Sequence, residues 1–345
     1  MVTEQEGTVQ INGHSLYSKS WLPDGPIKAK LLFIHGFSDH INRYTNFFSR
    51  LAERGIAVYG FDQRGWGRSV RKPSERGRTG TTEQVLADMA AFITPHLPAE
   101  GSNDPPVFVM GHSMGGAQVL TLLSRKEYAD SVVKWVRGWV LESPFIGFSP
   151  EETPSQVKIF LGRLAGKLLP HFQLKHIIDP ANLSRDKAVQ KSIAEDKLMH
   201  DTGTLEGFAG LLDRTAALAS GAAKPLGGGV VKSLWIGHGT QDKTTCFNAS
   251  RKYFDECVKG TVEDGEFKAY EGWYHQLHAD GPDSEQFYRD VGDWILARCG
   301  GGGDEAAKSG EGEGAKVGES AGGQDANAGN AEESAADRKR PEAKL

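Results

Sequence analysis

Cysteine is scarce in this sequence, and neither sign of charge dominates it. Its 345 residues include only three cysteines, which excludes a disulfide framework and a cysteine-based metal site and suits a reducing compartment. The 40 Lys and Arg residues against 45 Asp and Glu residues give a net charge of −5, so no nucleic-acid partner is expected. No apolar run reaches the about 20 residues of a membrane-spanning helix, and residues 1–10 lack the basic and apolar regions of a secretory signal. We therefore expect a cytoplasmic protein that is not an integral membrane protein.

Aromatic and large apolar residues are nearly missing from residues 300–345. This segment contains eleven glycines, and its net charge of −4 leaves only −1 for the first 299 residues. Such a composition cannot bury enough surface to offset the entropy lost on ordering, so we expect a disordered tail. The tail ends in Ala343-Lys344-Leu345, a near relative of the Ser-Lys-Leu peroxisomal address. A peroxisomal import receptor is therefore an alternative partner, and the peroxisome an alternative location.

The first 299 residues alternate short apolar runs with amphipathic stretches. The apolar runs comprise residues 31–34, 56–61, 107–110, 139–141 and 234–236, and the segment at residues 267–270 is taken as the last strand. Short continuous runs of this kind are typical of strands buried on both faces, as in a parallel sheet. The stretch at residues 81–97 has the apolar spacing of a helix. Together they predict an α/β fold, with a mostly parallel central sheet and helices on both faces.

No strand pattern is found between residues 145 and 229. Residues 157–168 instead carry apolar side chains spaced for one face of a helix, and a second helical pattern covers residues 205–218. An insertion of 85 residues is far longer than an ordinary connection. We predict a helical cap at 145–229, inserted between late strands of a core formed by 1–144 and 230–299 and followed by the tail at 300–345.

The segment Gly-His-Ser-Met-Gly at residues 111–115 matches the pattern Gly-x-Ser-x-Gly. In this motif the serine lies on a sharp turn between a strand and a helix, and the glycines allow close backbone approach. An apolar run precedes the segment and an apolar helical pattern at residues 117–123 follows it. A second match at residues 318–322 lies in the tail without either flank, so we discard it. Ser113 is the predicted nucleophile, which argues against epoxide hydrolases, since these use an aspartate.

A serine nucleophile needs a base and an acid that orients the base. In this kind of fold the chain order is serine, acid, histidine, and the acid follows a late strand. Asp242 meets this condition, whereas the alternatives Asp255 and Glu256 fall in a predicted helix. Two histidines, His275 and His278, follow the last predicted strand, at residues 267–270. We predict His275 as the base because it lies closer to the end of the strand.

The reaction also needs backbone N–H groups that stabilise an oxyanion. One donor is expected to be Met114, the residue after the nucleophile, and the second is expected in the loop after the first apolar run. Phe37 in that loop fits this role. The neighbouring His35 is expected only to hold the loop by hydrogen bonding.

These motifs together resemble the monoglyceride lipase (monoacylglycerol lipase) family of the α/β-hydrolases, and its fungal members in particular, over residues 8–297. The resemblance rests on HGFSDHINRY at 35–44, FDQRGWGRS at 61–69, GHSMGG at 111–116, LSRD at 183–186, HGTQDK at 238–243 and YEGWYHQLH at 270–278. It implies the same triad and oxyanion donors. It also implies cleavage of monoacylglycerols to glycerol and fatty acid through an acyl-enzyme, with no metal or organic cofactor.

The resemblance further suggests substrate contacts. It places Asp39 and Arg43 near the glycerol hydroxyls, although an ordinary ion pair between loop and helix is the alternative. Ile193 occupies the position where animal members carry a cap tyrosine, and His278 is a further candidate contact. A lysophospholipase or a broad carboxylesterase on the same fold remains an alternative, as does a non-catalytic lipid-binding protein. We expect transient contact with a lipid-droplet or endomembrane surface, and apolar cap residues either line an acyl tunnel or pack the cap on the core.

Overall fold

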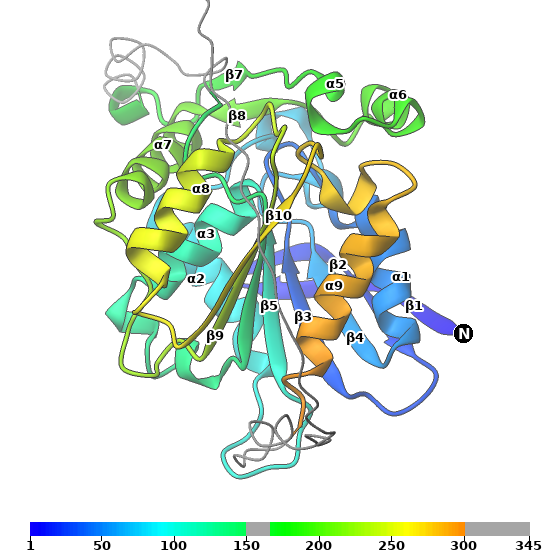
Figure 1. Ribbon diagram of the computed structural model, residues 1–345. Helices are drawn as coiled ribbons and strands as arrows, with labels where there is room; N and C mark the ends of the chain where they lie inside the picture. The colour runs from blue at the N-terminus through cyan, green and yellow to red at the C-terminus, as the bar shows by residue number, and fades with distance from the viewer. Residues whose placement is uncertain (150–165, 301–345) are drawn as a thin grey trace, which may run out of the picture. The chain divides into compact units, whose positions relative to one another are not determined.

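The structure is a computed structural model that describes residues 1–149 and 166–300. Its centre is one eight-stranded sheet of order β1-β2-β4-β3-β5-β6-β9-β10 (Figure 1). The strands are β1 (Val2–Ile11), β2 (His14–Pro23), β3 (Ala29–Ile34), β4 (Ile56–Phe61), β5 (Val107–His112), β6 (Gly138–Glu142), β9 (Ser233–Gly239) and β10 (Asp264–Tyr270). All pairs from β4 to β10 are parallel, and only β1 and β2 run antiparallel to their neighbours. The predicted α/β fold with a mostly parallel sheet is confirmed.

Helices cover both faces of this sheet, as predicted (Figure 1). The helices α1 (Thr45–Glu53) and α9 (Ser284–Leu296) pack on one face, and α2 (Thr82–Ile93), α3 (Met114–Leu123) and α8 (Phe247–Tyr253) pack on the other. Along β3, Leu31 and Phe33 join the core cluster of α1 and α9, while Leu32 and Ile34 join the opposite cluster. Since successive strand residues point to opposite faces, a continuous apolar run is what a strand between two helical layers requires.

The hairpin of β1 and β2 was not predicted. Most residues of β1 are exposed, so the strand has no apolar run that the sequence could reveal. The turn between the two strands is Asn12-Gly13, and both residues have positive φ, 46° and 78°. Asn-Gly is a preferred dipeptide for such tight hairpin turns, so this pair was the available signal.

Helices are the longest regular elements of the described residues between β6 and β9. This region contains α5 (Pro180–Leu183), α6 (Lys187–Glu195) and α7 (Leu205–Ala219), and α7 confirms the helix predicted at 205–218. It also contains an unpredicted two-stranded sheet of β7 (Gln173–Lys175) and β8 (Thr202–Thr204), whose three-residue strands are too short to show a period. Most of the helix predicted at 157–168 and the tail from 301 lie outside the described residues.

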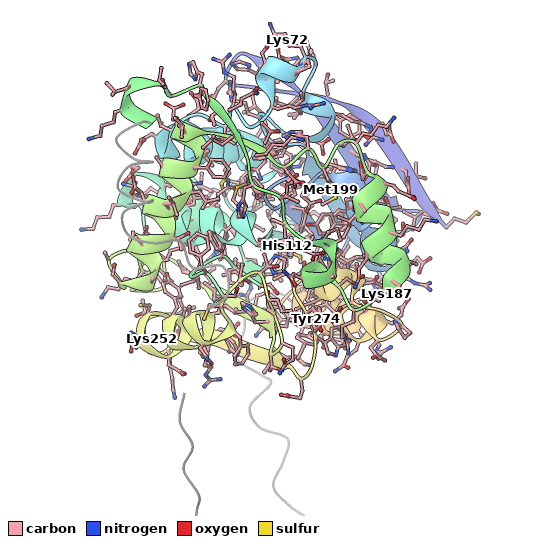
Figure 2. All side chains as sticks on the ribbon, turned by 90° about the horizontal axis from the view of Figure 1, so that it is seen from above. Lys72, His112, Lys187, Met199, Lys252 and Tyr274 are labelled. Atoms are coloured by element: carbon pink, nitrogen blue, oxygen red, sulfur yellow. The ribbon has the colours of Figure 1, made fainter. Side chains whose placement is uncertain are left out.

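The elements β7, β8, α5, α6 and α7, which belong to the predicted cap, lie together above the sheet (Figure 1). Seen from above, His112 and Met199 are located toward the middle of the molecule, whereas Lys72 and Lys187 lie near its edge (Figure 2). No helix in the described part of the chain combines the length and the apolar character needed to cross a membrane.

Candidate active site

Ser113 lies on a strained turn between β5 and α3. Its φ of 53° and ψ of −117° are rare for a residue with a side chain. A Cβ atom at Gly111 would lie 2.6 Å from the carbonyl oxygen of Gly115, and one at Gly115 would collide with the carbonyl oxygen of Ile34. Glycine is therefore a steric requirement at both positions, as the motif predicted. The turn places Ser113 directly after the carboxyl end of β5.

Asp242 and His275 form a buried pair. His275 Nδ1 lies 2.7 Å from Asp242 Oδ2, and the two side chains are 2% and 0% exposed. Asp242 Oδ1 also accepts the backbone N–H groups of Thr244 and Thr245 at 2.7 and 2.9 Å, and Oδ2 lies 3.0 Å from His238 Nε2. Burial opposes ionisation of Asp242, but the adjacent imidazoles of His275 and His238 hold its pKa below the ordinary value. The carboxylate is thus charged and held in a fixed orientation.

The state of His275 follows from the same contacts. Burial lowers the pKa of this imidazole, and the Asp242 carboxylate offsets only part of that effect. A neutral ring whose Nδ1–H is bound by Asp242 leaves the Nε2 lone pair free to accept a proton. His275 lines the same cavity as Ser113, about 270 Å³ in volume.

The alternative acid Asp255 and the second histidine, His278, have other partners. Asp255 lies in the π-helical turn Phe254–Val258 and forms an ion pair of 2.9 Å with Arg251. His278 is buried, and its Nδ1 lies 2.7 Å from Glu142 Oε1. Glu142 also accepts the backbone N–H of His278 at 3.0 Å and lies 3.4 Å from His112 Nδ1. His278 therefore belongs to a buried cluster with Glu142 and His112. Glu142, which sequence reasoning missed, could have been noticed as an acidic residue at the end of an apolar run.

The loop after β3 passes directly beside the Ser113 turn. A Cβ atom at Gly36 would lie 3.3 Å from Ser113 Cβ, so only glycine lets the loop approach this closely without displacing a neighbour. His35 Nε2 accepts the backbone N–H of Gln63 at 2.8 Å, and Gln63 Nε2 donates to the His35 carbonyl at 2.8 Å. His35 thus holds this loop, as expected. The loop brings Phe37 to Ser113, and Met114 begins α3 immediately after the serine.

Two cavities meet at Ser113. The first holds His275 and carries polar residues, among them Asp39 and Gln276. The second, of about 250 Å³, includes Phe37 and Met114 and is otherwise mainly apolar. Its apolar wall comes from Phe145, Phe148, Leu174, Ile178, Leu205 and Phe208. The serine hydroxyl therefore faces a compartment of mixed polarity on one side and an apolar one on the other.

Of the predicted substrate contacts Asp39, Ile193 and Arg43, the first two line a cavity at Ser113 and the third does not. Asp39 and Ile193 line the first cavity. Asp39 accepts the Tyr44 hydroxyl at 2.5 Å and the backbone N–H of His40 at 2.7 Å. Arg43 is not among the described residues that line this cavity.

Arg43 instead connects the core to the cap. Its Nη1 donates to Ser192 Oγ at 2.7 Å and lies 3.5 Å from Asp196 Oδ2. The alternative considered in the sequence was an ion pair between Asp39 and Arg43, whereas Arg43 approaches Asp196, just after α6, a partner that the sequence did not reveal. The 153 positions between Arg43 and Asp196 explain why.

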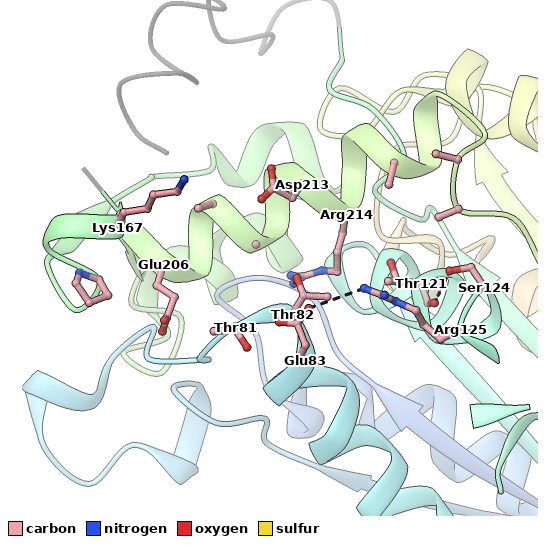
Figure 3. Close-up of a pocket in the computed structure, with 17 residues that line it drawn as sticks. Thr81, Thr82, Glu83, Thr121, Ser124, Arg125, Lys167, Glu206, Asp213 and Arg214 are labelled. Atoms are coloured by element: carbon pink, nitrogen blue, oxygen red, sulfur yellow. Dashed lines mark hydrogen bonds and ion pairs between the residues drawn. The ribbon is translucent and has the colours of Figure 1, made fainter. Parts of the chain in front are cut away.

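A larger hollow, of about 1050 Å³, lies beside α2, α3 and α7 (Figure 3). Arg214 is 5% exposed there, and its Nη1 donates to Thr82 Oγ1 at 2.9 Å. Burial lowers the pKa of Arg214 to about 10, so the guanidinium stays charged at neutral pH. The described residues that line this hollow include no histidine or cysteine. They therefore contain no serine–histidine pair like that at Ser113.

Known proteins are similar to this chain in sequence and in fold. A family model described as "Serine aminopeptidase, S33" matches residues 25–282. A Schizosaccharomyces pombe protein named "Putative monoglyceride lipase" is 32% identical over 287 residues, which cover 81% of this chain and 71% of that protein. The Mus musculus protein named "Monoglyceride lipase" is 28% identical over 302 residues, covering 86% of this chain and 91% of its own length.

Two solved structures extend the comparison. A soluble variant of monoglyceride lipase from Saccharomyces cerevisiae, in complex with a substrate analogue, matches with a TM-score of 0.77 at 20% identity and covers 86% of this chain and 96% of that chain. The monoacylglycerol lipase of Paleococcus ferrophilus matches with a TM-score of 0.67 at 26% identity, covering 82% and 99%. At 20% identity, the similarity to the Saccharomyces cerevisiae structure is evidence for the fold and not for the activity.

Proposed function

Because the chain belongs to the Hydrolase_4 (serine aminopeptidase, S33) family and is homologous to monoglyceride lipases, we propose that it is a carboxylic ester hydrolase that cleaves monoacylglycerols to glycerol and fatty acid. One observation carries the proposal. Ser113 lies where an apolar cavity meets a more polar one that also holds His275. A monoacylglycerol has the same two-part character, with an apolar acyl chain and a polar alcohol on either side of the ester bond.

The proposed reaction proceeds through an acyl-enzyme. His275 Nε2 takes the proton of the Ser113 hydroxyl while the oxygen attacks the ester carbonyl, and Asp242 stabilises the imidazolium that forms. The backbone N–H groups of Phe37 and Met114 are the proposed oxyanion donors, and loss of one such donor typically costs about 3 kcal/mol. The imidazolium then protonates the leaving glycerol oxygen. Water attacks the acyl-enzyme with His275 as base, which releases the fatty acid and restores Ser113.

The surface of the cap supports docking to a lipid surface. Five large apolar side chains of one short segment are exposed, from 42% to 75% of their area: Leu168, Leu169, Phe172, Leu174 and Ile177. Exposed apolar residues gathered in one segment are a feature of membrane and protein interaction sites. Leu174 and Ile177 also line the two cavities at Ser113. A substrate leaving a lipid droplet or endomembrane would thus meet the cap beside the cavities.

The alternative location in the peroxisome rests on Ala343-Lys344-Leu345, outside the described residues. A fluorescent protein fused to the N-terminus tests it, and fluorescence that stays diffuse in the cytosol would reject it. Deletion of the three residues is the matched control.

The proposed function is tested by fatty-acid release from monooleoylglycerol, dioleoylglycerol, lysophosphatidylcholine and a short-chain nitrophenyl ester, offered side by side. Monooleoylglycerol should dominate, and Ser113→Ala should abolish release. Preference for lysophosphatidylcholine or for the short ester would replace the substrate assignment with a lysophospholipase or a broad carboxylesterase. A wild-type protein that neither releases fatty acid nor reacts with a fluorophosphonate probe would indicate a non-catalytic lipid-binding protein.

A further inference from the structure

Gln276 is the residue after the predicted base, and it lines the cavity that holds Ser113 and His275. Its side chain is 3% exposed. The backbone N–H of Gln276 donates to the Leu183 carbonyl at 2.8 Å, which anchors the main chain to the cap. Its side-chain oxygen, Oε1, is buried and has no hydrogen-bond partner among the described residues. A buried acceptor of this kind is unfavourable unless something else supplies a donor.

Two polar neighbours in this cavity, Asp39 and Ser38, already have partners. Both carboxylate oxygens of Asp39 accept hydrogen bonds, from Tyr44 and from the backbone of His40. The Ser38 hydroxyl accepts the backbone N–H of Asp201 at 2.7 Å. Other parts of the lining are hydrocarbon, as at Leu183 and Ile193. Among the described residues of this lining, two buried polar atoms have no hydrogen-bond partner, His112 Nδ1 and Gln276 Oε1. His112 Nδ1 lies 3.4 Å from a carboxylate oxygen of Glu142, so Gln276 Oε1 is the acceptor that we assign to a ligand.

We propose that Gln276 is a specificity-determining residue whose Oε1 accepts a hydrogen bond from a free hydroxyl of the alcohol part of the ester. The inference rests on the proposed function and deepens it, since it selects esters of polyols over simple alkyl esters. The alkyl group of a simple ester carries no donor and leaves Oε1 unsatisfied. A site that is built to hydrogen-bond a substrate hydroxyl discriminates against analogues that lack it.

The position of Gln276 suits this role. It adjoins His275, the group proposed to protonate the leaving oxygen, and two or three carbon atoms separate that oxygen from the free hydroxyls of a monoacylglycerol. The amide is also uncharged. It therefore contributes an acceptor beside the base without adding a charge that would raise the pKa of His275.

The test compares kcat/KM for monooleoylglycerol and for methyl oleate, which has the same acyl chain and no hydroxyl. Gln276→Met keeps a similar volume and removes the acceptor. The ratio of the two values should fall about fivefold to tenfold in this variant, which is the usual net worth of one hydrogen bond. Gln118→Met is the matched control. Gln118 in α3 is 0% exposed and both its amide atoms lack a partner among the described residues, but it does not line the cavity. Its ratio should equal that of the wild type.

A second measurement needs no variant. The wild-type enzyme is given 2,3-dimethoxypropyl oleate, which keeps the oxygen atoms of the glycerol but cannot donate a hydrogen bond. Its kcat/KM should fall toward that of methyl oleate.

The outcomes separate the two claims. If the wild type prefers monooleoylglycerol but Gln276→Met keeps the wild-type ratio, or the dimethoxy ester is cleaved as well as the parent, the role of Gln276 is wrong and the proposed function stands. If the wild type does not cleave monooleoylglycerol, both fail.

Discussion

Glu142 Oε1 lies 2.7 Å from His278 Nδ1, and both side chains are fully buried, with 0% and 2% exposed. The pair lies beside the predicted nucleophile, because Glu142 also approaches His112, the residue before Ser113. The backbone supports the same contact, since the N–H of Ser113 donates to the Glu142 carbonyl at 3.0 Å. The end of β6 and the segment after β10 are thus joined at the serine turn.

Replacement of Glu142 by glutamine should destabilise the protein by about 2 kcal/mol, since the buried Nδ1 and backbone N–H of His278 would lose a charged acceptor. The pKa of Glu142 is lowered because His278 and His112 outweigh the opposing effect of burial. Its charge therefore stabilises the fold fully above the unfolded pKa of about 4.3 and progressively less as the pH falls through the folded pKa. Urea unfolding at several pH values measures both effects. Glu285→Gln, which removes an exposed ion pair with Arg50, should cost less than about 1 kcal/mol.

Asp242→Asn should lower kcat by about 10,000-fold, because an amide favours the wrong tautomer of His275 and no longer stabilises the imidazolium. The rate of monooleoylglycerol hydrolysis measures this loss. Asp255→Asn changes the acid that was considered as an alternative and should retain wild-type activity. A fall of the same size in Asp255→Asn would show that the acid has been misassigned.

The acid limb of the pH profile should reflect the environment of His275. Burial lowers its pKa, with only partial compensation by Asp242, and the base is active when neutral. The pH at which kcat/KM reaches half its maximum should therefore lie below about 6.5, the ordinary value for histidine. A soluble nitrophenyl ester allows this measurement without an interface. A midpoint above that value would contradict the assigned environment.

Asp196 should hold the C-terminal end of α6 against the core. It lies 2.9 Å from His40 Nε2 and 3.5 Å from Arg43 Nη1, and despite the opposing effect of burial these contacts lower its pKa to about 2. In Asp196→Asn, backbone amides of Lys187–Glu195 should exchange hydrogen severalfold faster at neutral pH. Glu195→Gln is the control, because its ion pair with Lys191 is exposed. Equal exchange in the two variants would show that Asp196 does not hold the helix.

The exposed leucines of the cap should contribute to docking at lipid. Leu168→Ser combined with Leu169→Ser should weaken sedimentation with triolein droplets coated by phosphatidylcholine by about tenfold, because less apolar area is buried at the interface. Ile27→Ser is the control, since Ile27 is exposed but lies in the loop between β2 and β3. Unchanged sedimentation of the double variant would exclude this surface as the docking site.

Several features of this protein follow from the sequence alone. The apolar runs predict β3, β4, β5, β6 and β9, because a strand between two helical layers must be apolar on both faces. The serine turn is equally local, since its steric demands fall on Gly111 and Gly115, within two residues of Ser113. Chain order after the late strands was enough to select Asp242 and His275, which the structure places 2.7 Å apart.

Other features were decided by the tertiary structure. The edge hairpin and the strands β7 and β8 need no apolar run, so the sequence carries little trace of them. The pairing of Glu142 with His278 joins residues 136 positions apart, and Arg43 finds its partners at the end of α6. Gln276 Oε1 is unsatisfied because the described residues packed around it supply no hydrogen-bond donor. Residues close together in the sequence determine the backbone conformation and the alternation of buried and exposed side chains. Side-chain hydrogen-bond partners and cavity walls instead come from distant segments, which meet only when the core packs.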